Sequence, residues 1–126
     1  MPRILYIEDN RDNRTLVRRV LSACDYDYRV EEAESAAIGI RMAQQNPPDL
    51  ILMDVSMPDM DGLTATRYLR TLPELTHIPI VAMTANAMSG DRERTLEAGC
   101  TGYITKPIDV DKLPDEIWKY LRSRQQ

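Results

Sequence analysis

The sequence predicts an α/β fold in which a parallel sheet carries helices on both faces. Short β-forming runs alternate five times with longer segments whose apolar residues recur at helical spacing. The central runs Leu50–Met53 and Ile80–Met83 are continuously apolar, which is typical of strands that are buried on both faces. Alternation of this kind indicates a parallel sheet, because each strand is followed by a helix that packs back onto it.

Five segments are expected to form the strands. Each is rich in aliphatic, aromatic or β-branched residues and ends in polar sequence: Ile4–Ile7, Tyr28–Ala33, Leu50–Met53, Ile80–Met83 and Gly102–Thr105.

Helices are expected in the five intervals, and several residues mark their ends. Ser35 fits the N-cap of the second helix, Pro73 closes the third, and Gly99 fits the position just after the fourth. Asp111 is expected to cap the fifth helix. Pro114 would then fall in its first turn, where a missing N–H group is tolerated.

Composition predicts one globular domain over residues 1–126. The chain is 43% hydrophobic and 29% charged, and it contains no linker or repeat that would separate a further domain. Its net charge of -4 argues against a nucleic-acid partner. The apolar runs are too short to span a membrane, and the start of the chain has no signal peptide, so a cytoplasmic location is expected. The two cysteines fit reduced structural thiols.

Polar residues follow four of the predicted strands. Glu8 and Asp9 follow the first, Asp54 the third, Thr84 the fourth and Lys106 the fifth. In a parallel sheet these positions meet at one edge, where ligands bind. Three crowded carboxylates repel one another unless a cation lies among them, and hard oxygen ligands suit Mg²⁺. Lys106 and Thr84 would then offer a charge and a hydroxyl to an incoming anion.

The ordered set of strand-end motifs resembles the CheY-like receiver domain of response regulators, over essentially the whole chain. The motifs are Glu8-Asp9, Asp54, Met57-Pro58, Asp61-Gly62, Thr84-Ala85 and Lys106-Pro107. The segments Ile78–Ala87 and Asp91–Gly99 are most similar to receivers that are stand-alone relay proteins and to those of hybrid histidine kinases. The resemblance implies a flavodoxin-like, doubly wound (βα)5 fold with strand order 2-1-3-4-5, and a receiver without an output domain.

The resemblance also implies a role for each residue that would hold the metal. Asp54 would be the phosphoacceptor and a Mg²⁺ ligand, and Asp9 would bind the metal directly. Glu8 would act through a bound water, in a position where many receivers have Asp. The backbone carbonyl of Ser56 would complete the protein's ligands.

The remaining roles concern the phosphoryl group and the switch. Thr84 would bond the phosphoryl group, Lys106 would pair with it, and Tyr103 would follow Thr84 as the second switch residue. The Lys106-Pro107 peptide would be cis. Ser56 and Asn86 would modulate hydrolysis of the acyl phosphate.

The implied reaction is phosphoryl transfer from a phosphohistidine on a sensor histidine kinase or histidine phosphotransferase to Asp54. The chain would catalyse its own phosphorylation and slow dephosphorylation, without acting as an enzyme on a separate substrate. Phosphorylation would switch the surface formed by helix four, strand five and helix five, which would bind a downstream target. The protein would be a monomer or a phosphorylation-dependent dimer, with no membrane partner.

Two other functions fit parts of the sequence. A haloacid dehalogenase-type hydrolase would need a second Asp two positions after the nucleophile, where this chain has Ser56. A pseudo-receiver that serves only as an interaction module would usually lack the acceptor, the acidic pair or the lysine. Taken alone, Asp54 also fits a strand-end cap, and Tyr103 a sheet aromatic.

A last prediction concerns Trp118 in the fifth helix. It follows Ile117, which belongs to the apolar stripe of that helix, so its side chain is turned about 100° from the stripe. We expect Trp118 on a partner surface near Tyr103, and the alternative is that it covers the helix edge.

Overall fold

The computed structural model describes residues 1–85 and 89–124, and it confirms the predicted fold. Five parallel strands form one sheet in the order β2-β1-β3-β4-β5. The strands are β1 (Arg3–Ile7), β2 (Arg29–Ala33), β3 (Leu50–Asp54), β4 (Ile80–Thr84) and β5 (Gly102–Thr105). The helices are α1 (Arg11–Ala23), α2 (Ala36–Gln45), α3 (Gly62–Arg70), α4 (Ser89–Glu97) and α5 (Leu113–Arg124).

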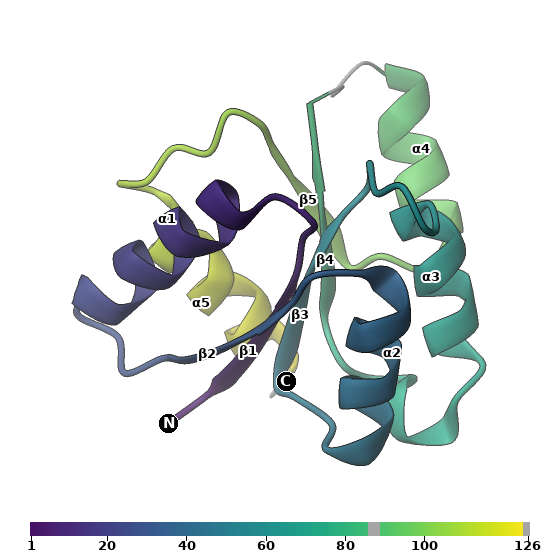
Figure 1. The fold of residues 1–126 in the computed structure, drawn as a ribbon, viewed down its shortest axis with the longest axis horizontal. Helices are drawn as coiled ribbons and strands as arrows, with labels where there is room; N and C mark the ends of the chain where they lie inside the picture. Colours follow the sequence, from purple (N-terminus) through teal and green to yellow (C-terminus); the bar gives the residue numbers. More distant parts are fainter. Residues whose placement is uncertain (86–88, 125–126) are drawn as a thin grey trace.

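The sheet separates two layers of helices (Figure 1). Helices α1 and α5 cover one face, and α2, α3 and α4 cover the other. Successive side chains of a strand point to opposite faces, so each central strand contributes to both cores. In β1, Ile4 and Tyr6 pack with α1 and α5, whereas Leu5 and Ile7 pack on the opposite side. Burial on both faces explains the continuous apolar runs of the central strands.

The observed element ends differ from the predicted ones in a few places. Strands β3 and β4 each continue by one residue, to Asp54 and Thr84, so these two polar side chains belong to the sheet itself. A short 3-10 helix, Pro73–Leu75, follows α3 and was not predicted. Strand β2 begins at Arg29, because Tyr28 precedes its ladder with β1.

Two of the predicted caps are confirmed and one is wrong. The Ser35 side chain accepts a hydrogen bond from the Ile38 N–H group, and Gly99 has a φ of 107° after α4. Helix α5 begins at Leu113, and the turn before it is held by Asp109, whose carbonyl accepts from the Leu113 N–H group and whose side chain accepts from Asp111. Asp109, two positions before Asp111, therefore has the capping role that was expected for Asp111.

Trp118 lies on the opposite side of α5 from the predicted one. Its ring stacks on Tyr26 of the α1–β2 loop, with ring centroids 5.0 Å apart and planes at 19°. Tyr26 in turn stacks on Tyr28 at 5.4 Å. The α5 residues that line a cavity with Tyr103 are Glu116, Lys119 and Tyr120, and Trp118 is not among them. The prediction that Trp118 flanks Tyr103 is therefore wrong, although its side chain is 38% exposed and lies outside the core.

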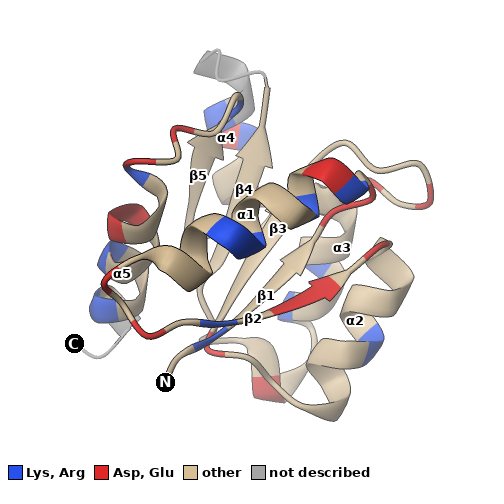
Figure 2. Ribbon diagram, turned by 60° about the vertical axis from the view of Figure 1, so that its left-hand side comes forward, with Lys and Arg blue, Asp and Glu red and all other residues tan. Residues whose placement is uncertain are grey.

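Charge is spread over the molecule. In the view of Figure 2, Lys and Arg lie on α1, α2, α4 and α5 and do not gather in a single patch. Among the described residues, no helix combines the length and the apolar character needed to cross a membrane.

Candidate functional site

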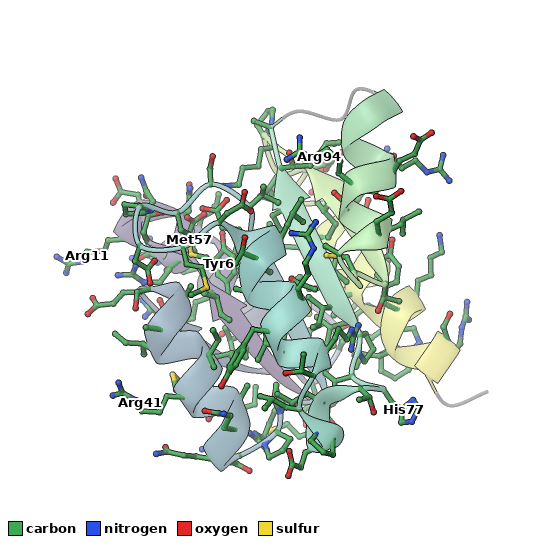
Figure 3. All side chains as sticks on the ribbon, turned by 90° about the vertical axis from the view of Figure 1, so that its right-hand side faces the viewer. Tyr6, Arg11, Arg41, Met57, His77 and Arg94 are labelled. Atoms are coloured by element: carbon green, nitrogen blue, oxygen red, sulfur yellow. The ribbon has the colours of Figure 1, made fainter. Side chains whose placement is uncertain are left out.

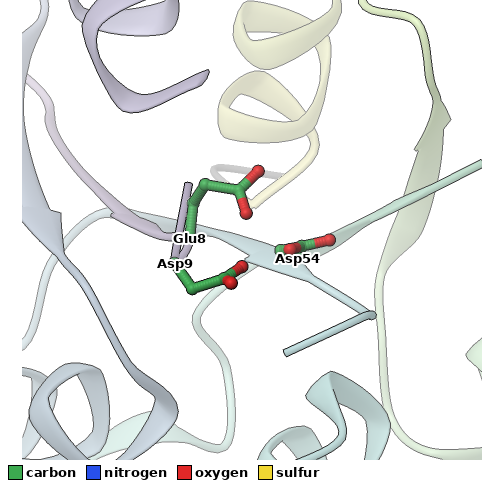
Figure 4. A group of neighbouring side chains, drawn as sticks. All are labelled: Glu8, Asp9 and Asp54. Atoms are coloured by element: carbon green, nitrogen blue, oxygen red, sulfur yellow. The ribbon is translucent and has the colours of Figure 1, made fainter. Parts of the chain in front are cut away.

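Three carboxylates meet where β1 and β3 end. Strands β1 and β3 are neighbours, with Ile7 beside Met53, so the residues that follow Ile7 lie next to Asp54. One side-chain oxygen each from Glu8, Asp9 and Asp54 lies within 4.8 Å of the others. Figure 4 shows the Asp9 carboxylate directed toward Asp54, with Glu8 beside them. The predicted acidic cluster is therefore present in the structure.

Lys106 brings a positive charge into this cluster from the end of β5. Its Nζ lies 2.8 Å from Oδ1 of Asp54 and 3.2 Å from Oε1 of Glu8. Burial lowers the pKa of Lys106, but hydrogen bonding to Asp54 and the charges of both carboxylates outweigh burial and raise it. Lys106 therefore stays a cation at neutral pH.

The positive charge of Lys106 does not neutralise the negative charge of the three carboxylates. Burial and the adjoining Glu8 carboxyl group raise the pKa of Asp54 to about 7, and the hydrogen bond from Lys106 offsets this only in part. Glu8 and Asp54 are 1% and 2% exposed, whereas Asp9 is open to solvent. Crowded, largely desolvated oxygen ligands with one side open fit a hard divalent cation such as Mg²⁺, which keeps several waters.

A cavity of about 320 Å³ lies beside the cluster. Among the residues that line it are four of the predicted site residues: Asp54, Ser56, Thr84 and Lys106. Two further charged residues, Asp61 and Arg94, also line it. Arg94 comes from α4, and Figure 3 shows it on the side of that helix that faces the strands. The sequence alone does not indicate which side chains of α4 face the strands, so Arg94 was not predicted as a site residue.

The loop between β3 and α3 is fixed at several points. The Ser56 N–H group donates to Oδ1 of Asp54 at 3.3 Å. Asp61 caps α3 through the Leu63 N–H group at 2.7 Å, and the Gly62 N–H group donates to Val55. A Cβ atom on Gly62 would overlap the carbonyl oxygen of Asp54, which explains a glycine at this position.

The same loop is also tied to α2. The Asp59 carboxylate accepts from the N–H groups of Ala36 and Ala37, at 3.3 and 3.2 Å. These are free donors of the first turn of α2, so a residue 23 positions away helps to cap that helix. The segment that carries Ser56 is therefore held against its neighbours.

The remaining predicted residues are placed as follows. Thr84 is buried at the end of β4, and Tyr103 is partly buried in β5. Tyr103 and Tyr120 line a second cavity of about 530 Å³ between β5 and α5. The Lys106-Pro107 peptide bond is cis, as the resemblance implied. Asn86 lies outside the described residues.

The five-fold strand–helix repeat and the acidic strand ends define a class, the doubly wound α/β domains with a carboxylate cluster at the carboxyl edge of the sheet. Residues 4–118 match the family model of the response regulator receiver domain. The chain belongs to this family, and so to the proteins of two-component systems.

Named relatives agree with this assignment. The polar-differentiation response regulator DivK of Brucella ovis is 40% identical over 118 residues, covering 94% of each chain. The receiver domain of the sensor histidine kinase PA1611 from Pseudomonas aeruginosa is 36% identical, with a TM-score of 0.86 over 96% of this chain and 98% of that one. Its crystal structure has a magnesium ion coordinated in the active site cleft. Chemotaxis protein CheY4 of Vibrio cholerae has a TM-score of 0.89 at 26% identity, covering 95% and 98%.

Proposed function

We propose that this chain accepts a phosphoryl group from a phosphohistidine onto Asp54, in a site that holds one Mg²⁺ ion. The observation that carries the proposal is the contact of Lys106 with Asp54 inside the cluster of three carboxylates. This arrangement supplies a nucleophile and a positive charge that both line one cavity, beside an acidic cluster suited to a metal ion.

Glu8, Asp9, Asp54 and the carbonyl of Ser56 would hold the ion, Asp9 directly and Glu8 through water. Bound there, Mg²⁺ supplies charge neutralisation for a phosphoryl group in transfer. The donor set consists of oxygens alone, which is what Mg²⁺ prefers.

The reaction forms a bond between a carboxylate oxygen of Asp54 and phosphorus as the bond from phosphorus to the histidine nitrogen breaks. Lys106 pairs with the transferred group, and Thr84 bonds one of its oxygens. Both residues line the cavity with Asp54, so neither needs a long movement to reach the group. The acyl phosphate is then hydrolysed slowly, and Ser56 and Asn86 modulate the rate.

Phosphorylation would change the conformation of a surface that binds other proteins. A phosphoryl group that draws Thr84 inward would leave space for Tyr103, which is partly buried in the neighbouring strand. The surface formed by α4, β5 and α5 would shift between two conformations, and a downstream target would bind one of them. The donor would be a sensor histidine kinase or a histidine phosphotransferase. Family membership supports a cytoplasmic location and a domain that works by protein contact.

A small donor tests this function without a cognate kinase. Phosphoramidate carries a P–N bond, as phosphohistidine does. Incubation with phosphoramidate and Mg²⁺ should add one phosphoryl group that hydroxylamine removes, because hydroxylamine cleaves acyl phosphates. A stable adduct that resists hydroxylamine would contradict a carboxylate acceptor.

A further inference from the structure

The Glu8 carboxylate is held by hydrogen bonds from several neighbouring residues. Three donors converge on its Oε1 atom: the Tyr6 hydroxyl at 3.0 Å, Nδ2 of Asn13 at 3.1 Å and Nζ of Lys106 at 3.2 Å. Its Oε2 atom accepts the Asn10 N–H group, at the long distance of 3.4 Å. One oxygen is therefore saturated, and the other keeps lone pairs for the cluster.

Tyr6 is an unexpected source for one of these donors. It lies in the middle of β1 with 0% exposure, in the apolar layer between the sheet and α1 and α5. Residues two apart in a strand point to the same face, so its hydroxyl can reach Glu8. A buried hydroxyl is costly unless it is hydrogen-bonded, and Glu8 is its hydrogen-bond partner.

We propose that Tyr6 and Asn13 are positioning residues that fix the Glu8 carboxylate so that Oε2 serves the divalent cation. The proposal rests on the metal site of the proposed function. A glutamate has several rotatable bonds, and ordering it on metal binding costs conformational entropy. Donors from β1 and α1 impose that order before the metal arrives, because neither depends on the ion.

Tyr6→Phe removes only the hydroxyl and keeps the ring in the core. Mg²⁺ affinity, measured by calorimetry at fixed pH, should fall by about tenfold, as is common when a residue that orients a ligand is lost. Tyr28→Phe is the matched control, because Tyr28 is also buried and donates to the carbonyl of Pro114, away from the cluster. Both variants lose a buried hydrogen bond, but the control should keep the wild-type affinity.

A comparison of Tyr6→Phe in two backgrounds separates the loss of Glu8 orientation from a general destabilisation of the fold. Glu8→Asp shortens the side chain and withdraws its carboxylate from Tyr6. In that background, adding Tyr6→Phe should leave Mg²⁺ affinity unchanged. An equal fall in both backgrounds, or an equal fall in the Tyr28→Phe control, would overturn the proposal.

If Tyr6→Phe fails to fold, Asn13→Ala carries the same test, because Asn13 is only partly buried on α1. Unchanged affinity in this variant would overturn the role of Asn13. Wild-type protein that binds Mg²⁺ but is not phosphorylated would instead contradict the proposed function and leave the positioning role standing. Wild-type protein that fails to bind Mg²⁺ would overturn both.

Discussion

Nζ of Lys106 lies 2.8 Å from Oδ1 of Asp54, although the two residues are 52 positions apart and their strands are separated by β4. The long lysine side chain crosses the end of β4 to reach the acceptor. In doing so it places its charge among the carboxylates before any phosphoryl group arrives. Lys106 therefore competes with a metal ion for the same oxygens, which leads to the first prediction.

Lys106→Ala should bind Mg²⁺ as tightly as wild type or more tightly, because it removes a positive charge from the site. Phosphorylation by a small donor should still be impaired, since the group loses its cationic partner. Calorimetry and the rate of phosphorylation measure the two effects separately. Lys112→Ala, an exposed lysine outside the cluster, is the control. Weaker Mg²⁺ binding by a folded Lys106→Ala would contradict the assignment.

The stability of the metal-free protein should depend on Asp54 and on pH. The pKa of Asp54 is raised to about 7, above its unfolded value, so the stability tied to its neutral form is lost as pH rises through that pKa. Asp54→Asn cannot ionise. Without metal it should therefore be more stable than wild type near pH 8, and the difference should shrink toward pH 5.

Urea unfolding with a chelator present measures this difference, and Asp27→Asn, an exposed residue of the α1–β2 loop, is the control. Saturating Mg²⁺ should stabilise the wild type and narrow the gap at pH 8. A difference that is the same at both pH values would show that ionisation of Asp54 is not its cause.

Arg94 should contribute to anion binding. It lines the cavity beside Asp54 and Lys106, and a guanidinium group pairs well with a tetrahedral anion. Arg94→Ala should weaken binding of beryllofluoride, a phosphoryl analogue, in the presence of Mg²⁺. Arg92→Ala removes the same charge from an exposed position of the same helix that does not line the cavity, and it should bind nearly as wild type does. Equal losses in both variants would point to a general charge effect.

Trp118 should stabilise the packing between α5 and the α1–β2 loop. Its stacking on Tyr26 predicts a coupling energy of about 0.5–1.5 kcal/mol in a double-mutant cycle of Trp118→Ala and Tyr26→Ala. Urea unfolding of the four proteins gives this value. Additive losses would mean that the stack is not energetically coupled. A loss of about 3–5 kcal/mol for Trp118→Ala alone would indicate a core residue instead.

The strand ends were predictable because the apolar runs of the sheet stop abruptly at polar residues. Asp54 and Thr84 follow such runs, and a parallel sheet brings all their ends to one edge. The apolar stripe of α5 is buried as its spacing predicts, but the side on which Trp118 finds its neighbour was not predictable, because Tyr26 comes from a loop. In the sequence, Tyr6 looks like one more apolar residue of a buried strand. The role of its hydroxyl becomes clear only once the structure places Glu8 within hydrogen-bonding distance of it. The cap that Asp59 gives to α2 depends on a contact between two loops.

The most direct test of the account is the intact mass of the protein after incubation with acetyl phosphate. Wild-type protein with Mg²⁺ should gain one phosphoryl group, whereas Asp54→Asn, or wild type with a chelator, should gain none. Modification of Asp54→Asn at the wild-type rate, or phosphorylation of the wild type that is indifferent to chelation, would contradict the central claim that Asp54 is the metal-dependent phosphoacceptor.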